Sequence, residues 1–136
     1  MKFKFLEHTA DVKFQAFGKT LGGVFANAAL AMFNVMYKDP IKKTKKFRIK
    51  VDGRDLESLL YNFLEEFLFL LDTKGFFLSK IKKIKIDPKK FVLEADVEGD
   101  DAENYEINLG VKAVTYNDMF IKKQKDRWIV QVVIDV

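Results

Sequence analysis

The stretch DLESLLYNFLEEFLFLLDTKG, residues 55–75, decides the fold of this chain. Asp55 is a residue type that caps helix starts, and Gly75 is the type that most often ends a helix. Between them apolar side chains recur at helical spacing and line one face, namely Leu56, Leu59, Leu60, Phe63, Leu64, Phe67 and Leu71. Phe69 and Leu70 widen this stripe. The pattern predicts a long amphipathic helix that covers the face of a sheet.

The preceding half of the chain predicts two short strands, a first helix and a third strand. Segments 2–6 and 12–17 have strand length and apolar character. Thr20 is an expected N-cap, and Asp39-Pro40 is expected to stop the helix. Within it apolar residues recur at Leu21, Val24, Phe25, Ala28, Ala29, Met32 and Phe33. A strand follows near 43–51, and Asp52-Gly53 provides the turn into the second helix.

After Gly75 the apolar period changes to two. We expect five strands near 76–86, 90–98, 106–115, 118–124 and 127–135, separated by turn-forming residues. Strands joined by tight turns pair antiparallel. The expected fold class is therefore α+β, with largely antiparallel sheet or sheets and two main helices packed on one face, in the order ββαβα followed by a five-strand meander. Residues 1–136 are expected to form a single domain.

The amino-acid composition excludes some classes of chemistry and predicts a cellular location. The chain has 136 residues, no cysteine and a formal net charge of +4. Thiolate chemistry is therefore excluded, and with neither a membrane-length apolar run nor a secretory signal pattern we expect a cytoplasmic location. Lysines cluster at 42–50 and 80–85. These clusters are open to two interpretations, contacts to RNA phosphates or solvated strand faces that discourage edge pairing. High Lys and Glu content also fits a thermophile source.

Two aspartates near opposite ends of the chain are the candidate functional residues. Asp11 directly precedes the second strand segment and belongs to its polar face, and Asp135 interrupts the apolar run of the last strand between Ile134 and Val136. If the two carboxylates approach to about 4 Å, their repulsion is on the order of 4 kcal/mol at an effective dielectric near 20. One of them must then be protonated, or a cation must lie between them. The alternative is that Asp11 caps a turn and Asp135 is solvated at a frayed end.

A cation between these aspartates would have oxygen ligands. Hard divalent ions such as Ca²⁺, Mg²⁺ or Mn²⁺ prefer them, and a main-chain carbonyl or carboxylate of Val136 and waters would complete the set. His8 is the one histidine. It has three possible roles: direct metal ligand, hydrogen-bond donor to Asp11, or cap of the strand break. A lone histidine without cysteines does not make a zinc site.

Five short blocks occur in order along the chain: His8-Thr-Ala-Asp-Val12, Asn27-Ala-Ala-Leu-Ala-Met-Phe33, Asp55-Leu-Glu-Ser-Leu-Leu60, Val111-Lys-Ala-Val-Thr-Tyr116 and Ile134-Asp-Val136. With this order and spacing the sequence resembles the archease family from end to end. The resemblance implies a non-enzymatic, metal-binding protein cofactor that activates the GTP-dependent RNA ligase of tRNA splicing, the RtcB-type ligase. It also implies that Asp11 and Asp135 hold the metal.

The chain departs from the family pattern at positions that often carry histidines. It has Asn104-Tyr105 and Asn117 there, so roles attached to those histidines are in doubt. Lys112 and Tyr116 match the family and are candidates for contacts with the ligase or an anionic ligand, or for structural strand positions. Glu65 and Glu66 point about 100° apart on the helix and are expected to be surface charge or part of a partner contact.

Two other functions compete with the ligase cofactor. One is a metal-dependent phosphoester hydrolase that uses the same carboxylates to bind a water-activating ion. The other is an RNA-binding module or RNA chaperone that uses the lysine-rich strands and whose affinity falls steeply with salt. A P-loop, a nucleophile elbow and a Cys-His dyad are all missing from the sequence.

Overall fold

A computed structural model describes residues 1–6 and 11–136. In chain order the elements are β1 (Phe3–Leu6), β2 (Val12–Gly18), α1 (Leu21–Met36), β3 (Lys45–Asp52), α2 (Leu56–Lys74), β4 (Phe76–Asp87), β5 (Val92–Asp101), a 3₁₀ turn (Ala102–Asn104), β6 (Ala113–Gln124) and β7 (Arg127–Asp135). The expected α+β class and the order ββαβα are confirmed. None of the described helices is long and apolar enough to cross a membrane.

Both helices begin at the caps that the sequence predicts. The side chain of Thr20 accepts a hydrogen bond from the backbone N–H of Gly23, and the side chain of Asp55 accepts one from the N–H of Ser58. Ser58 in turn accepts through its hydroxyl from the N–H of Asp55, which completes a capping box. At the far end of α2, Gly75 adopts φ 61°, a left-handed conformation that costs glycine little.

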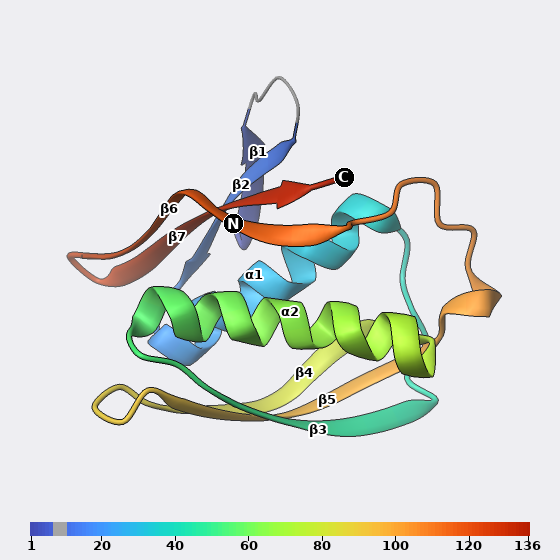
Figure 1. Ribbon diagram of the computed structural model, residues 1–136, viewed down its shortest axis with the longest axis horizontal. Coiled ribbons are helices and arrows are strands. Elements are labelled where there is room, and N and C mark those ends of the chain that lie inside the picture. The colour runs from blue at the N-terminus through green and yellow to red at the C-terminus, as the bar shows by residue number, and fades with distance from the viewer. Residues whose placement is uncertain (7–10) are drawn as a thin grey trace.

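The strands form two antiparallel sheets with the helices between them (Figure 1). One sheet has the order β1-β2-β7-β6 and the other the order β3-β5-β4. Helix α1 packs on β2 and β4, and α2 packs on β6 and β3. Each sheet therefore has one face covered by helices and one face open.

The width of the apolar surface on the helices explains why two sheets are needed. Eight residues of α1 are buried, and they are too many for one stripe: Val24, Phe25, Ala28, Ala29, Ala31, Met32, Phe33 and Met36. Aromatic rings join the layers, with Phe33 against Phe67 of α2 at 5.7 Å and against Phe77 of β4 at 4.8 Å between ring centroids. A helix pair that is apolar on both sides buries both only when sheets cover it from two directions.

The strands after α2 differ in detail from the expected meander. Four strands follow α2, and the two hairpins that they form belong to different sheets. Residues 106–112 are not in a strand, and Asn117 with Asp118 lies inside β6 in an irregularity between Thr115 and Phe120. The side-chain amide of Gln131 donates to the carbonyl of Asp118 at 2.8 Å, which satisfies the backbone there. Such a bulge resembles a turn in sequence because both favour Asn and Asp.

Candidate metal centre

Strand pairing brings the two predicted aspartates to the same end of one sheet. In the β2–β7 ladder Val12 pairs with Ile134, so one further step of the same register sets Asp11 opposite Asp135. Directly opposed residues of antiparallel strands have Cα atoms about 4.5–5.5 Å apart. Figure 1 shows the C-terminus near the end of β2 at which the strand begins. Chain positions 124 residues apart in sequence are thus neighbours in space.

Both aspartates lie on the open face of this sheet and are half-buried. Residues that share a strand face alternate, so Asp135 lies with Val133 and Gln131, while Val132 and Ile134 face the helices. On β2 the open face continues from Asp11 to Lys13. The ammonium of Lys13 lies 3.1 Å from a carboxylate oxygen of Asp118, so part of its charge is engaged within the β6 bulge.

Val136 and Lys112 meet Asp135 through the main chain. The N–H of Lys112 donates to the carbonyl oxygen of Asp135 at 2.7 Å, which fixes that residue from the β6 side. The Lys112 side chain is exposed. Val136 is half-buried and packs against the core. The structure therefore brings together Asp11, Asp135, Val136 and Lys112, while the predicted role of His8 falls on residue 8, outside the described residues.

The donor set fits a hard cation better than a soft one. Two carboxylates and a main-chain oxygen of Val136 are all oxygen ligands, which Ca²⁺, Mg²⁺ and Mn²⁺ prefer. Within residues 1–6 and 11–136, no group of three or more His, Cys, Asp and Glu side chains is arranged to hold a metal ion. The predicted site is therefore a two-carboxylate site at the open end of a sheet.

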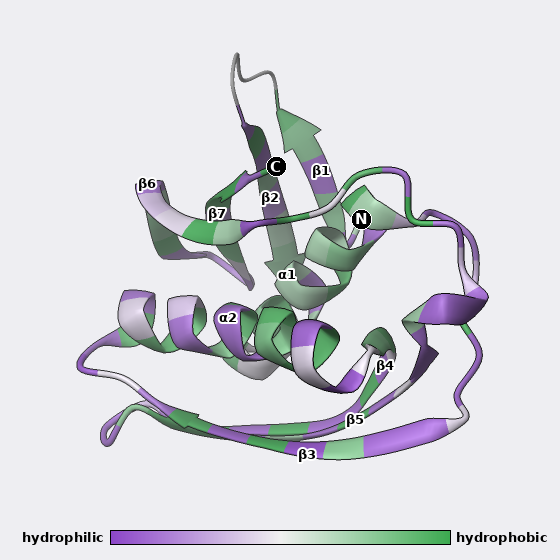
Figure 2. Ribbon diagram, turned by 45° about the vertical axis from the view of Figure 1, so that its right-hand side comes forward, coloured by the Kyte–Doolittle hydropathy of each residue, from purple (hydrophilic) through white to green (hydrophobic). Residues whose placement is uncertain are grey.

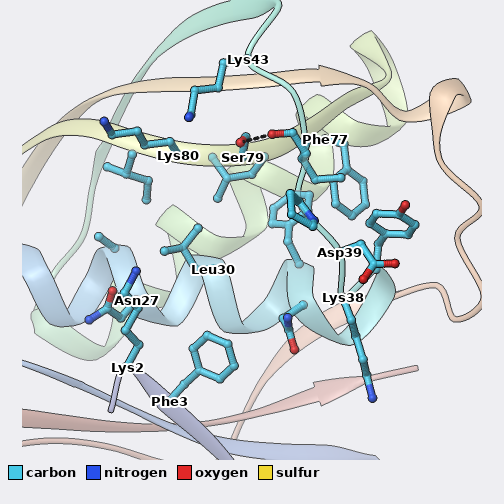
Figure 3. Close-up of a pocket in the computed structure, with 18 residues that line it drawn as sticks. Lys2, Phe3, Asn27, Leu30, Lys38, Asp39, Lys43, Phe77, Ser79 and Lys80 are labelled. Carbon is cyan, nitrogen blue, oxygen red and sulfur yellow. Dashed lines mark hydrogen bonds between the residues drawn. The ribbon is translucent and has the colours of Figure 1, made fainter.

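A hollow elsewhere in the molecule is not part of this site. About 600 Å³ of space lies between α1 and the edge strands β1 and β4, with Leu30 on α1, Phe3 on one side, and Lys43 and Lys80 on the other (Figure 3). None of the four residues brought together at the strand ends lines it. The candidate site is therefore separate from this hollow.

Sequence reasoning missed a second carboxylate site, which is built around Asp100. The strand β5 continues to Asp101, beyond the expected end at 98, and Asp100 is only 3% exposed. The hydroxyl of Thr44, the amide of Asn104 and the hydroxyl of Tyr105 all donate to its carboxylate, the last at 2.6 Å. The Thr44 and Tyr105 hydrogen bonds hold the pKa of Asp100 well below its usual range.

Two of the residues that depart from the family pattern belong to the Asp100 cluster. Burial, together with the hydrogen bond to Asp100, raises the pKa of Tyr105, and the Tyr105 oxygen also accepts from the N–H of Lys42 at 2.9 Å. The cluster ties the segment before β3 to the end of β5. Asn104 donates a further hydrogen bond within it. The sequence gives little sign of this cluster because Thr44 and Asp100 are 56 residues apart.

Glu65, expected as surface charge or a partner contact, and Tyr116, expected as a partner contact or a structural strand position, both have contacts within the protein. The carboxylate of Glu65 accepts a hydrogen bond from the N–H of Val114 at 2.7 Å, so it docks α2 on the outer edge of β6. Tyr116 stacks on Tyr61 of α2, with ring centroids 4.4 Å apart and planes 9° from parallel, and remains 51% exposed. Burial, and then the neighbouring Tyr61, raises the pKa of Tyr116.

Comparison with known proteins assigns the chain to one family. The model of the archease protein family matches residues 3–136. The protein archease of Pyrococcus furiosus is 43% identical over 136 residues, covering 96% of this chain and 95% of that protein. The protein archease of Methanosarcina acetivorans is 39% identical, covering 99% and 96%.

Solved structures agree in fold. The solution structure of a Methanobacterium thermoautotrophicum protein has a TM-score of 0.82 and 37% identity, and the match covers 98% of each chain. The crystal structure of a Thermotoga maritima archease, described as a possible chaperone, has a TM-score of 0.67 at 18% identity, covering 98% of this chain and 96% of that one. The second likeness concerns the fold alone.

Proposed function

Because this chain belongs to the archease protein family, we propose that it is a protein cofactor of the GTP-dependent RNA ligase of tRNA splicing. In this role it promotes guanylylation and multiple turnover of the ligase and is not itself an enzyme. We place this activity in the cytoplasm. The family match over residues 3–136 supports the proposal.

The second part of the proposal is a divalent metal ion, calcium, magnesium or manganese, held by Asp11, Asp135 and a main-chain oxygen of Val136. The observation that carries it is the β2–β7 register, which aligns Asp11 with Asp135 at adjacent strand ends. Two carboxylates about 4 Å apart repel each other by on the order of 4 kcal/mol at an effective dielectric near 20. A cation bound between them attracts both carboxylates and offsets this repulsion.

The residues around the aspartates prepare the site before any ion binds. The β2–β7 ladder fixes the backbone on one side of Asp135, and the hydrogen bond from Lys112 fixes it on the other. Lys13, on the same strand face, forms an ion pair with Asp118. When bound, the ion supplies a local positive charge that can act on the phosphates of a nucleotide in a partner's site. We propose that His8 and the Lys112 side chain interact with the ligands of the ion and do not bind the ion directly.

Ligase assays with matched variants test this function. Guanylylation and turnover of the ligase are measured with the wild type, Asp11→Asn and Asp135→Asn, and with Asp126→Asn as a control at the exposed β6–β7 turn. We expect the first two variants to lose most of the stimulation and the control to keep it. Full stimulation by both Asp11→Asn and Asp135→Asn would refute the metal role.

The same preparations separate the cofactor from the alternative hydrolase. The protein alone is incubated with Mn²⁺ and a generic phosphodiester, without ligase. A protein cofactor gives no turnover in this assay. Turnover that disappears in Asp135→Asn would instead support a metal-dependent phosphoester hydrolase.

A further inference from the structure

The open face of the β3-β5-β4 sheet carries a regular arrangement of charges, which we call the charged ladder. Each of its three rungs has a cation from β3, a carboxylate from β5 and a cation from β4. The rungs are Lys46–Glu98–Lys80, Arg48–Asp96–Lys83 and Lys50–Glu94–Lys85. Lys82, in the irregularity between Ile81 and Lys83, adds a further cation. Figure 2 shows hydrophilic and hydrophobic residues alternating along β3.

The charged ladder accounts for the net charge of the whole protein. Its seven cations and three carboxylates give a formal net charge of +4, which equals the formal net charge of the 136-residue chain. The remainder of the sequence is therefore balanced. A weak overall positive charge thus conceals one strongly positive face, and potentials at a surface depend on such local concentration.

The cations of the ladder lie further out than its carboxylates. Arg48 is 69% exposed and Asp96, 3.1 Å away, is 42% exposed. Lys50 is 70% exposed and Glu94, 3.7 Å away, is 43% exposed. Lysine and arginine side chains are longer than those of aspartate and glutamate, so their charged ends reach past the acidic row. A ligand that approaches this face meets ammonium and guanidinium groups before it meets carboxylates.

A hollow on the ladder shows where an anion has room to lie. It measures about 510 Å³ and includes Lys46, Arg48, Lys82 and Lys83 in its lining, together with the carboxylates of Asp96 and Glu98. The side chains that alternate with the ladder, such as Ile49, Ala95 and Val97, are buried in the core. Phe47 and Val97 also line the hollow, but the exposed side chains of the ladder are charged.

We propose that the charged ladder binds the phosphate backbone of RNA without reading its sequence. Charge complementarity selects a polyanion, and contacts to phosphates alone position a nucleic acid without specifying bases. The choice of RNA among polyanions rests on the proposed function, in which the partner ligase joins RNA. The surface is separate from the Asp11–Asp135 site, which belongs to the other sheet.

The test measures binding of a fluorescently labelled, mixed-sequence single-stranded RNA by anisotropy, without ligase and in the presence of EDTA. Each phosphate contact to a single strand adds a slope of roughly −0.7 to log K against log salt, so about four contacts give a slope of about −3. The ladder variant carries Lys80→Ala, Lys83→Ala and Lys85→Ala. We expect it to bind at least about tenfold more weakly in low salt, with a slope about 2 units shallower.

A control variant with the same change in net charge separates the effect of the charged ladder from the effect of net charge alone. It carries Lys4→Ala, Lys19→Ala and Lys122→Ala, three exposed positions outside the ladder, and we expect it to bind RNA nearly as the wild type does. Thermal melting confirms that both variants are folded. Equal weakening by the two variants, or binding that does not depend on salt, overturns the proposal.

A competition arm distinguishes RNA from an acidic protein surface. Unlabelled RNA should displace the labelled strand at a lower concentration of charge than poly-glutamate does. If poly-glutamate competes equally well, the ladder is a site for acidic proteins and the RNA assignment is wrong. Because these measurements use neither metal nor ligase, their failure leaves the proposed ligase function untouched, and failure of the ligase assay leaves this surface untouched.

Discussion

Two carboxylate sites in this molecule show opposite ways of placing an acid in a fold. Asp100 is 3% exposed and receives hydrogen bonds from Thr44, Asn104 and Tyr105. Asp11 and Asp135 are half-buried and are set opposite each other by the β2–β7 register. At Asp100 the protein supplies donors to one anion. At the strand ends it aligns two anions.

The difference indicates what each site is for. A buried carboxylate with three donors is favourable as it stands, because hydrogen bonds to a charged group contribute more than those between neutral groups. Two carboxylates side by side repel each other, and a cation bound by both offsets this repulsion. We therefore interpret the Asp100 cluster as a structural tie, whereas the Asp11–Asp135 pair is the ligand site that we propose.

The largest effect on stability is expected at Asp100. Replacing it with alanine leaves the hydroxyls of Thr44 and Tyr105 without their acceptor, so we expect the free energy of unfolding to fall by about 3 kcal/mol. Urea denaturation in EDTA measures this change. Divalent metal affinity should stay unchanged, and a stability within about 0.5 kcal/mol of the wild type would show that the cluster is not a tie.

The second effect concerns the response to metal. A ligand at one hundred times its dissociation constant stabilises a folded protein by about 2.7 kcal/mol, so saturating Ca²⁺ or Mn²⁺ should raise the melting temperature and EDTA should reverse the rise. Asp11→Asn and Asp135→Asn should lose this response, because each removes one carboxylate ligand of the ion. Asp100→Ala should retain the response to metal.

The pH dependence of stability provides the third effect. Because the folded state lowers the pKa of Asp100 below its unfolded value near 3.9, its contribution is fully present above that value and is lost as pH falls toward the folded pKa. The difference in unfolding free energy between wild type and Asp100→Ala should thus shrink from pH 7 to pH 3. A difference that stays constant over this range would contradict the assignment.

The smallest expected effect is the difference in unfolding free energy between variants of two neighbouring glutamates. Glu65 accepts the hydrogen bond from Val114, so Glu65→Ala should lower the free energy of unfolding by about 1 kcal/mol. Glu66→Ala removes the adjacent charge on the same helix and should change it by less than about 0.5 kcal/mol. Equal losses in the two variants would show that the Glu65 contact does not stabilise the edge of β6.

The sequence predicts most of the elements because local signals define them. Asp55 and Gly75 bound α2 as expected, and Thr20 caps α1. The division of the late strands between two sheets is not a local property. It follows from the apolar width of the helices, which has to be covered from both sides. The bulge at Asn117 and Asp118 was expected as a turn because its stabilising partner, Gln131, comes from another strand.

Of the candidate sites, the sequence likewise predicts those with a local signal and misses those built from distant segments. Asp11 and Asp135 could be named from the sequence because a charge stands out in an apolar strand and because the family resemblance pairs them. The Asp100 cluster could not, since Gly99-Asp100-Asp101 has the composition of a turn and Thr44 contributes from a distant segment. The Glu65 contact was likewise missed, because an acid on a helix surface gives no indication that a strand edge lies beside it.

The most direct test of the central claim is an anomalous scattering map from crystals of this protein soaked in Mn²⁺. The account predicts a peak within metal-ligand distance of carboxylate oxygens from both Asp11 and Asp135, and no such peak in crystals of Asp135→Asn. A wild-type map without a peak at these strand ends, in crystals with the ion present at millimolar concentration, would contradict it.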